Sequence, residues 1–418
     1  MADLVVELYG QLVGHLRGED WRTFDFTVDP AAFERFGIGS AVLSEAVPFA
    51  RVLARGRAAR RRNFFSELMP EGDALDALAR RARVATQDTI GMLRAYGRDV
   101  AGAVQLWDPD APGEPRTPRA EAVTETEIET LLLDRASSPL GNRLVEGKTS
   151  LAGVQPKIVL ARRGDTWNQV LDGYPSTHIL KPALERQPTI IFDEDYGARI
   201  GRAAGILAYD TELVTFNSVT ALVIQRYDRG DWPTGRLHQE DMNQALGVSR
   251  DGKYQEHGSG SMNLARIAAV FRNRGDIDSI RRLLRIVIVA VAVGNLDLHG
   301  KNVSMLHYPD GTAKIAPAYD IVPLAHHSNV DGRMAMSIGG VYPHKQLTAD
   351  LIAHEGESWG LRDARSLVED TLAELADAAE AEQPDARAHP DLGDDVRTFI
   401  LNLRKGQAAG SPVSVAHP

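Results

Sequence analysis

The stretch Asn295-Leu-Asp-Leu-His-Gly-Lys-Asn302 decides which fold and which chemistry this chain is expected to have. It combines two carboxamides, a carboxylate, an imidazole and an ammonium group in one short loop. The preceding run from Asp276 to Gly294 predicts a buried helix, because apolar residues recur at helical spacing and Asp276 or Asp278 can cap its start. A buried helix that ends in such a polar loop is a rigid support for a reactive site.

The spacing inside the loop indicates phosphoryl transfer. Asp297 precedes Asn302 by five positions, the separation found in the Asp-x-x-x-x-Asn catalytic loop of protein kinases. There the aspartate takes the proton of the substrate hydroxyl and the asparagine holds a metal ion. The alternative is that both residues only cap and turn the chain, as most loop aspartates and asparagines do.

A β-hairpin is expected directly after this loop. Residues 303–308 and 313–318 flank Pro309-Asp310-Gly311-Thr312, which is a strong turn signal. The hairpin would return Asp320 to the loop, and the aspartate in this place in kinases binds the metal ion.

The composition is that of an ordinary globular protein. The chain has 418 residues, of which 43% are hydrophobic and 25% charged, so two or three domains are expected. No long apolar run or signal-peptide pattern is present, and the absence of cysteine excludes disulfides, zinc–thiolate sites and cysteine nucleophiles. These features fit a cytoplasmic protein. The net charge of −10 argues against a chain that coats nucleic acid unaided.

The ends of the chain differ from its middle. Residues 1–107 read as a small α+β module, residues 108–125 as a linker or joint rich in Pro, Asp, Glu and Thr, and residues 406–418 as a disordered tail. Within the module, the stretch Arg51–Arg62 carries six arginines. It predicts a solvated face, with contact to a partner or to DNA as the alternative.

A phosphate loop is indicated, but not of the Walker type. Gly147-Lys148-Thr149 would need a glycine at position 142, where Asn142 stands. The segment Ser150–Lys157 and the apolar run behind it instead predict strand, small-residue turn and strand. Small residues let backbone N–H groups approach nucleotide phosphates closely. An ordinary hairpin is the alternative.

Two further segments fit nucleotide binding. Lys181 ends an apolar strand after the glycine-containing loop, the kinase arrangement for gripping the α- and β-phosphates. A surface lysine at a sheet edge is the alternative, and Glu194 or Asp195 in the next helix could pair with Lys181. The backbone from Gln225 to Tyr227 would form the hinge that meets adenine.

Together these residues resemble the HipA family of serine/threonine kinases, the toxin components of bacterial toxin–antitoxin pairs. The resemblance covers roughly residues 1–370, and the catalytic loop is its most specific part. The matching segments are Ser150–Lys157, His178–Lys181, Gln225–Arg229, His238–Met242, Asn295–Asn302, Tyr319-Asp320 and, in the first module, Asn63–Phe65, Leu68–Gly72 and Gly97–Gly102. The sequence departs from the family pattern at Pro156, Gln225 and Leu296, and Pro156 could stiffen the phosphate loop.

The resemblance implies an α+β, two-lobed protein-kinase-like fold with the small amino-terminal α+β module added. Residues 126–230 would form the N-lobe with phosphate loop and hinge, and residues 231–405 a mostly helical C-lobe. It also implies the site residues. The catalytic base would be Asp297, with His299 and Lys301 around it; the Mg²⁺ ligands would be Asn302 and Asp320; and the ATP contacts would come from Ser150, Ala152, Gly153, Val154, Lys181, Gln225, Tyr227, Asp228 and His299.

Regulation and partners also follow from the resemblance. Ser150 matches a phosphate-loop serine whose autophosphorylation expels the loop and silences the kinase. The implied partner is a HipB-like helix-turn-helix antitoxin that carries the complex to operator DNA and co-represses the operon. The implied protein substrate is a translation factor or an aminoacyl-tRNA synthetase, whose phosphorylation arrests growth.

Three other functions remain as alternatives. The chain could be a catalytically idle nucleotide-binding co-repressor, although the expected lysine, aspartates and asparagine are all present. It could also be a small-molecule kinase on the same scaffold. A metal hydrolase would use Asp297, His299, His326 and His327, but adjacent histidines on a regular element cannot both face one site, and no His-Glu-x-x-His motif is present.

Overall fold

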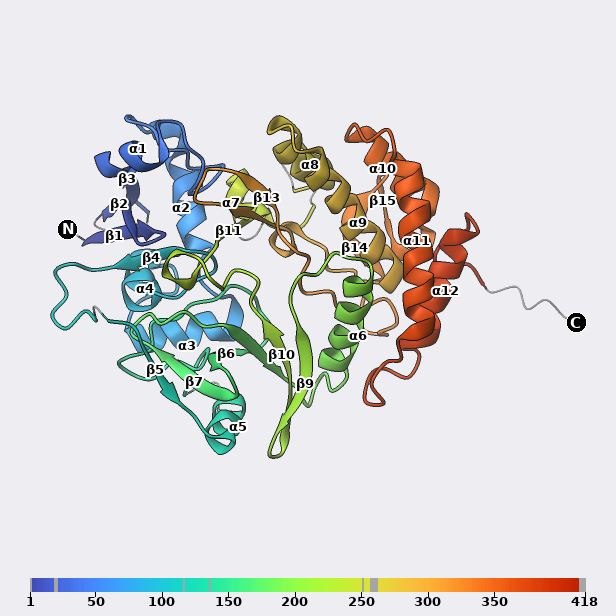
Figure 1. Cartoon of the computed structure of the whole chain (residues 1–418), viewed down its shortest axis with the longest axis horizontal. Coiled ribbons are helices and arrows are strands. Elements are labelled where there is room, and N and C mark those ends of the chain that lie inside the picture. Colours follow the sequence, from blue (N-terminus) through green and yellow to red (C-terminus); the bar gives the residue numbers. More distant parts are fainter. Residues whose placement is uncertain are drawn as a thin grey trace, which may run out of the picture. The chain divides into compact units, whose positions relative to one another are not determined.

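The structure is a computed structural model that describes residues 2–18, 22–115, 117–134, 137–249, 252–255 and 262–412. The chain forms two compact units (Figure 1). Unit 1 comprises Met1–Pro182, Glu212–Arg250 and Met305–Ala313, and unit 2 comprises Ala183–Thr211, Asp251–Ser304 and Lys314–Pro418. Among the described residues, no helix is both long and apolar enough to cross a membrane.

The first part of unit 1 is the expected small α+β module. Its antiparallel sheet has the order β3-β2-β1-β4, and its strands are β1 (Ala2–Leu8), β2 (Gln11–Gly18), β3 (Asp25–Val28) and β4 (Val104–Trp107). Tyr9 and Gly10, both at positive φ, make the β1–β2 turn. The accompanying helices are α1 (Pro30–Phe36), η1 (Arg55–Arg57), α2 (Ala58–Ser66), α3 (Gly72–Ala82) and α4 (Thr89–Tyr96).

The arginine stretch of this module is partly structural. Arg61 is buried and makes a bidentate ion pair with Asp25, with distances of 2.6 Å from Nε to Oδ1 and 2.7 Å from Nη2 to Oδ2. The side chains of Arg51, Arg55, Arg57 and Arg60 are exposed, as expected for a solvated face.

The second sheet of unit 1 has six strands in the order β5-β7-β6-β8-β10-β9. The strands are β5 (Arg119–Ala122), β6 (Ile158–Arg163), β7 (Thr166–Leu171), β8 (His178–Pro182), β9 (Thr211–Phe216) and β10 (Val219–Gln225), and helix α5 (Glu125–Leu133) precedes β6. The expected linker at 108–125 therefore contains a strand, because β5 pairs with β7 and Arg119 lies opposite Leu171. One hydrophobic core joins both parts of unit 1, since Leu151 and Val159 share a cluster with Leu4 and Phe64.

The expected hairpin after the catalytic-loop motif is present. Strands β11 (His238–Asp241), β12 (Ser304–His307) and β13 (Ala313–Ile315) form a three-stranded sheet in that order. Asp241 caps α7 (Met242–Leu246) by accepting a hydrogen bond from the Gln244 backbone N–H at 2.9 Å, and η2 (Pro233–Gly235) precedes β11.

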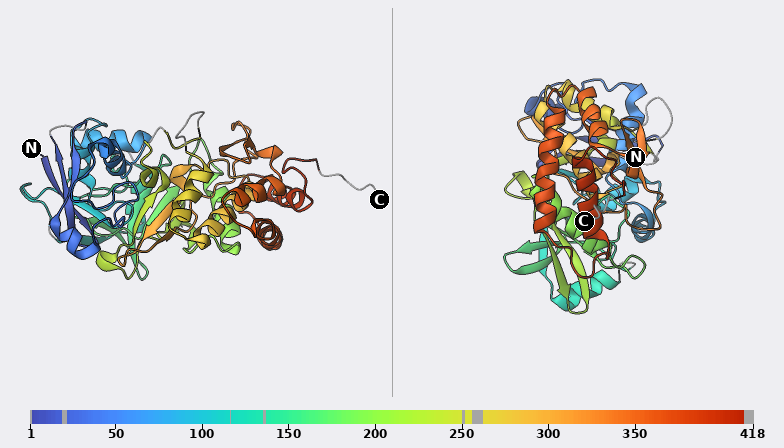
Figure 2. Two further views of the ribbon diagram at one scale, coloured as in Figure 1. Left: turned by 90° about the horizontal axis from the view of Figure 1, so that it is seen from above. Right: turned by 90° about the vertical axis from the view of Figure 1, so that its right-hand side faces the viewer.

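Unit 2 is mostly helical, as expected. Its elements are α6 (Ile190–Ala203), α8 (Leu264–Asn273), α9 (Ile277–Val293), η4 (Gly300–Asn302), β14 (Arg333–Ile338), β15 (Val341–Pro343), η5 (His344–Gln346), α10 (Ala349–Ser358), α11 (Ala364–Ala381) and α12 (Leu392–Arg404). The central helix α9 packs against α8, α10, α11 and α12, and Figure 2 shows α11 and α12 side by side. Asp276 caps α9 by accepting from the Ser279 backbone N–H at 3.0 Å, which confirms the predicted helix start.

The expected disordered tail is wrong for its first part. Asn402 Nδ2 donates hydrogen bonds to the carbonyls of Ala409 (2.9 Å) and Ser411 (2.8 Å), and Ala409 is fully buried. These contacts fix residues 406–411 against α12, while residues 413–418 lie outside the described residues.

Candidate active site

The catalytic-loop motif begins where α9 ends. Gly294 terminates the helix in the left-handed conformation at φ 72°, and a Cβ there would lie 2.7 Å from the Cβ of Ala325. Its carbonyl accepts hydrogen bonds from the backbone N–H groups of Leu324 (2.8 Å) and Ala325 (3.0 Å). Glycine is therefore required both for the turn and for the close approach of the segment after Asp320.

Hydrogen bonds within the loop fix its shape. Asn295 Oδ1 accepts from the Asp297 backbone N–H at 3.1 Å, and Asn302 Nδ2 donates to the Asp297 carbonyl at 2.9 Å. The His299 backbone N–H donates to the same carbonyl at 2.8 Å. The backbone of Asp297 is thus held on both sides, while its side chain stays 43% exposed, so that a substrate hydroxyl can reach the carboxylate.

The neighbours of Asp297 are buried. His299 Nε2 lies 3.8 Å from Asp297 Oδ2, and the Tyr254 ring packs edge-on against the imidazole with ring centroids 5.2 Å apart. The carbonyl of buried Lys301 accepts a 2.6 Å hydrogen bond from the hydroxyl of Tyr319. The two expected companions of the base therefore lie in the same loop on either side of Gly300.

The hairpin returns Asp320 to this loop. Asn295 Nδ2 donates to the Asp320 carbonyl at 3.4 Å, and Tyr319, the preceding residue, contacts Lys301. Asp320 adopts φ 56°, a left-handed conformation that asparagine and aspartate tolerate better than most residues. Asn302 and Asp320, expected from the sequence to share a metal ion, therefore lie on connected parts of one hydrogen-bonded structure.

Helix α6 supports the segment that carries Asp320. A Cβ atom added at Gly197 would lie 2.2 Å from the Ile321 carbonyl oxygen and 2.9 Å from Pro323 Cδ. One atom belongs to the backbone and the other to a proline ring, so neither can move by a simple side-chain rotation. The helix therefore contacts the backbone next to Asp320 directly.

We predict that Gly197→Ala displaces this segment. The added methyl group should cost about 1–3 kcal/mol of folding free energy, as overpacking usually does, and should lower the rate of phosphoryl transfer at least about tenfold because the backbone beside Asp320 must shift. Thermal unfolding and steady-state kinetics measure the two effects. The control is Ala203→Ser, which adds one atom at an exposed position of α6. Wild-type kinetics in Gly197→Ala would refute the supporting role.

A cavity of about 450 Å³ adjoins the carboxylate of Asp297. Aromatic, aliphatic and charged side chains line it: Tyr254, Gln255, Leu296, Asp297, Leu324, Val330, Asp331, Arg333, Met334, Ala335 and Tyr342. The guanidinium of Arg333 stacks 4.7 Å from the centre of the Tyr342 ring. Asp297 and the surrounding apolar and charged side chains therefore border one cavity within unit 2.

The expected phosphate loop has a different local structure from the prediction. Residues 150–157, all described, form neither strand nor helix, and the hairpin lies one step later, between β6 and β7. Gly153 takes φ 109°, and Lys157 Nζ donates to the Ala152 carbonyl at 2.8 Å. Ser150 is fully buried, and its Oγ donates to the Leu68 carbonyl at 2.9 Å. The loop is therefore held against the amino-terminal module.

Lys181 lies on β8, as predicted. It pairs with Leu222 of β10 and is 6% exposed. Asp195, one of the two partners expected for Lys181, pairs with Arg199 within α6 at 3.0 Å. On the hinge side, Gln225 ends β10 and is exposed, and the side chain of Tyr227 contacts Gln239.

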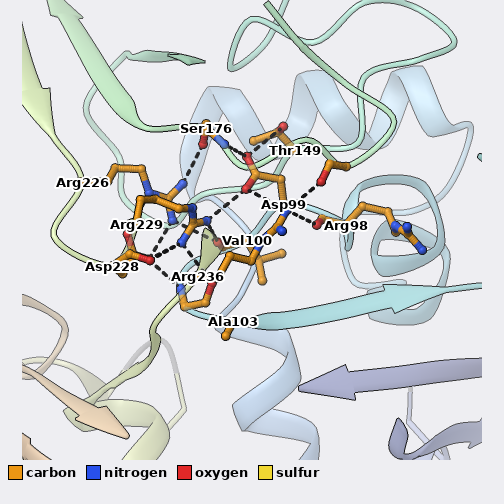
Figure 3. A network of polar contacts seen from close by, with 12 residues as sticks. Arg98, Asp99, Val100, Ala103, Thr149, Ser176, Arg226, Asp228, Arg229 and Arg236 are labelled. Atoms are coloured by element: carbon orange, nitrogen blue, oxygen red, sulfur yellow. Dashed lines mark hydrogen bonds and ion pairs between the residues drawn. The ribbon is translucent and has the colours of Figure 1, made fainter. Parts of the chain in front are cut away.

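Asp228 has a structural environment, in contrast to the ligand contact expected from the sequence. Its carboxylate accepts from Arg226 (2.9 and 3.0 Å), from Arg229 (2.9 Å) and from the Gly102 backbone N–H (2.7 Å) (Figure 3). Burial alone would raise the pKa of this carboxyl, but the two arginines outweigh that effect and lower it. All of its acceptor sites thus face protein donors.

Asp99 completes this buried network. Its Oδ1 pairs with Arg229 at 3.0 Å and lies 3.8 Å from Arg236, whose pKa burial lowers to about 9 (Figure 3). Oδ2 accepts from the Ser176 backbone N–H at 3.3 Å. The network therefore joins the amino-terminal module, the segment before β8 and the segment after β10 within unit 1.

Asn295, Tyr319 and Gly197 contact the loop or the segment around Asp320, a role that was not predicted from the sequence. Asn295 and Tyr319 stand inside the quoted motifs, so their position was the available signal. The sequence signal at Gly197 was weaker: a glycine within a helix costs stability and often marks close packing.

The comparisons with known proteins agree with this geometry. Residues 4–107 match the HipA N-terminal domain, and residues 149–382 match the HipA-like C-terminal domain. A putative kinase of Sinorhizobium fredii, Y4mE, is 33% identical over 69% of this chain and 70% of its own length. The serine/threonine-protein kinase toxin HipA of Shewanella oneidensis is 27% identical over 82% of this chain and 81% of its own length.

The fold of this chain is also similar to that of a solved protein. The solved HipA of Shewanella oneidensis, in complex with HipB and operator DNA, superposes with a TM-score of 0.76 at 23% identity over 96% of this chain and 99% of its own. The fold and the loop at 295–302 define a protein-kinase-like enzyme. The chain belongs to the HipA family, whose curated relatives are named as kinases.

Proposed function

We propose that this chain is an ATP-dependent serine/threonine protein kinase that acts as the toxin of a toxin–antitoxin pair. The observation that carries the proposal is the partly exposed carboxylate of Asp297, on a backbone that Asn295 and Asn302 hold beside the backbone of Asp320. Positioning and electrostatics supply most of the catalysis in phosphoryl transfer, and a preorganised loop of this kind provides both.

In this mechanism Asp297 accepts the proton of the substrate hydroxyl. The backbone contacts of the loop keep its carboxylate in place, and His299 limits its rotation from 3.8 Å away. Lys301, on the other side of Gly300, offers a positive charge for the transferred phosphoryl group. The peptide around the hydroxyl would occupy the cavity lined by Tyr254 and Arg333.

Asn302 and Asp320 fit a magnesium ion. Mg²⁺ takes oxygen ligands, and Asn302 donates its amide hydrogen to the Asp297 carbonyl, which leaves its oxygen as the ligand atom. The carboxylate of Asp320, on a backbone in the left-handed conformation, would be the other ligand. When bound, the ion would neutralise phosphate charge.

Lys181 would bind the phosphates of ATP, and we predict that Lys181→Met weakens ATP binding at least about tenfold. A hydrogen bond to a charged group contributes about 1.5–3 kcal/mol, and 1.4 kcal/mol corresponds to a factor of ten. Isothermal titration with ATP and Mg²⁺ measures the change. Lys314→Met removes an exposed strand lysine as a matched control, and equal affinities of the two variants would refute the assignment.

Ser150 is the proposed autophosphorylation site. Its hydroxyl is fully buried and bonded to the Leu68 carbonyl. A phosphate with about two negative charges cannot be buried there unpaired. Phosphorylation would therefore force residues 150–157 away from the module and disable the phosphate loop, in keeping with a self-silencing kinase.

The proposed partner is a HipB-like helix-turn-helix antitoxin that brings the complex to operator DNA. The support is the solved relative, whose described complex contains HipA, HipB and operator DNA. Co-expression with a small helix-turn-helix protein encoded beside this chain should yield a stable complex that retards operator DNA.

The alternatives predict different outcomes. An idle co-repressor would bind ATP and support operator repression in that complex without transferring phosphate. A small-molecule kinase would phosphorylate members of a metabolite panel but no peptide of an array.

For the leading proposal, the substrates would be translation factors and aminoacyl-tRNA synthetases, whose phosphorylation in the cytoplasm would arrest growth.

A further inference from the structure

A cluster of histidines around Asp193 lies in unit 2 outside the kinase machinery. Asp193 stands in the first turn of α6, His326 and His327 in a turn after Asp320, and His389 just before α12. From the sequence, the adjacent His326 and His327 were not expected to face one site. They can do so because they lie in a turn and not in a helix or strand.

The side chains converge closely. Asp193 Oδ2 lies 2.9 Å from His327 Nε2 and 3.7 Å from His326 Nε2, and one ligand atom from each of these three residues falls within 4.8 Å of the others. The His389 ring centroid is 4.5 Å from that of His326 and 5.2 Å from that of His327. Three groups that commonly bind transition metals therefore surround one small volume, and the ring of His389 packs against the two histidines among them.

Hydrogen bonding accounts for His327, whose Nε2 lies 2.9 Å from Asp193 Oδ2, but not for the buried ring of His326. The side chains of Asp193 and His326 are 0% and 1% exposed. Within the described part of the chain, neither ring nitrogen of His326 has a hydrogen-bond partner, and its 3.7 Å contact with Asp193 exceeds hydrogen-bond length. A buried polar group left unsatisfied costs about 1–3 kcal/mol. A bound cation would satisfy this imidazole.

We propose that Asp193, His326, His327 and His389 bind a transition-metal dication such as Zn²⁺, separately from the magnesium of the kinase site. Tetrahedral zinc with ligands about 2.0–2.1 Å away separates its ligand atoms by about 3.3 Å, between the two observed distances from Asp193. Three imidazoles and one carboxylate favour zinc, nickel or copper, whereas Mg²⁺ prefers oxygen ligands.

The surroundings already orient the carboxylate as a metal site requires. Thr189 Oγ1 donates to Asp193 Oδ2 at 2.9 Å, and the His389 backbone N–H donates to Oδ1 at 2.8 Å. Such supporting hydrogen bonds orient metal ligands in known sites. The ion would join α6, the segment that follows Asp320 and the segment before α12 within unit 2.

Zinc binding by the full chain tests the proposal without any measurement of kinase activity. The metal-free protein is titrated with Zn²⁺ in excess Mg²⁺, and with Co²⁺ for its visible absorption. We expect one zinc per chain, a tetrahedral cobalt spectrum, and a higher unfolding temperature with zinc. The double variant His326→Gln/His327→Gln should bind zinc at least about 100-fold more weakly.

The controls separate this outcome from misfolding and from the kinase site. His354→Gln alters an exposed histidine of α10 outside the cluster and should bind zinc like the wild type. If the double variant fails to fold in EDTA, His389→Gln replaces it and should still weaken binding and alter the cobalt spectrum. No stoichiometric zinc, displacement of zinc by Mg²⁺, or unchanged affinity in the cluster variants would overturn the proposal.

Discussion

Replacing Asp297 with asparagine is expected to slow phosphoryl transfer by about 10²–10⁴-fold, the usual contribution of a positioned general base. The amide keeps the size of the side chain but cannot accept the hydroxyl proton. ATP affinity should stay nearly unchanged, because the proposed phosphate and metal ligands remain. Steady-state kinetics on a peptide that the wild type phosphorylates, together with ATP titration, measures both.

Folding should be unaffected by this change. The Asp297 side chain is partly exposed, and the loop is held through the backbone of Asp297, so the unfolding temperature should match the wild type. Asp278→Asn, at an exposed position of α9, is the matched control and should keep full activity. A fully active Asp297→Asn enzyme would remove this residue from the mechanism.

The largest expected effect on stability is that of Asp228→Asn. The carboxylate of Asp228 faces Arg226 and Arg229, all three side chains being at most 3% exposed. Asparagine would remove the negative charge of Asp228 from the network. Arg226, Arg229 and Arg236 would then share Asp99 as the remaining acidic side chain of the network. Breaking a buried ion pair from one side typically costs about 3–5 kcal/mol.

Urea unfolding of the full chain measures this loss. Because the chain forms two compact units, unfolding need not be two-state, and a fluorescent label placed in unit 1 is needed to report the relevant transition. Asp165→Asn, an exposed position in the turn between β6 and β7, is the control and should change little. A loss below about 1 kcal/mol in Asp228→Asn would contradict the structural role.

The sequence predicted those parts of the site that depend on neighbouring residues. Helix α9, its aspartate cap, the loop at 295–302 and the hairpin to Asp320 follow from local periodicity, capping and turn chemistry. Each lies within a few tens of residues, so the pattern could be recognised without knowledge of distant contacts.

The parts that could not be predicted depend on distant partners. Asp228 reads as a hinge residue, but Gly102, 126 residues earlier, donates to its carboxylate. Asp193 and His327 meet across 134 residues. The short sequence of β5 has little strand character, and it becomes a strand only by pairing with β7. Similarly, Ala409 is held because Asn402 binds the tail backbone.

The central claim is that this chain transfers phosphate from ATP to a protein by means of the loop at 295–302. The direct measurement is incubation with γ-labelled ATP, Mg²⁺ and host lysate, followed by mass spectrometry of the labelled proteins. The mechanism predicts phosphoserine or phosphothreonine on a host protein with the wild type, and labelling reduced at least about 100-fold with Asp297→Asn or Asp320→Asn. Labelling that persists undiminished in both variants, or none with a wild-type protein that binds ATP, would contradict it.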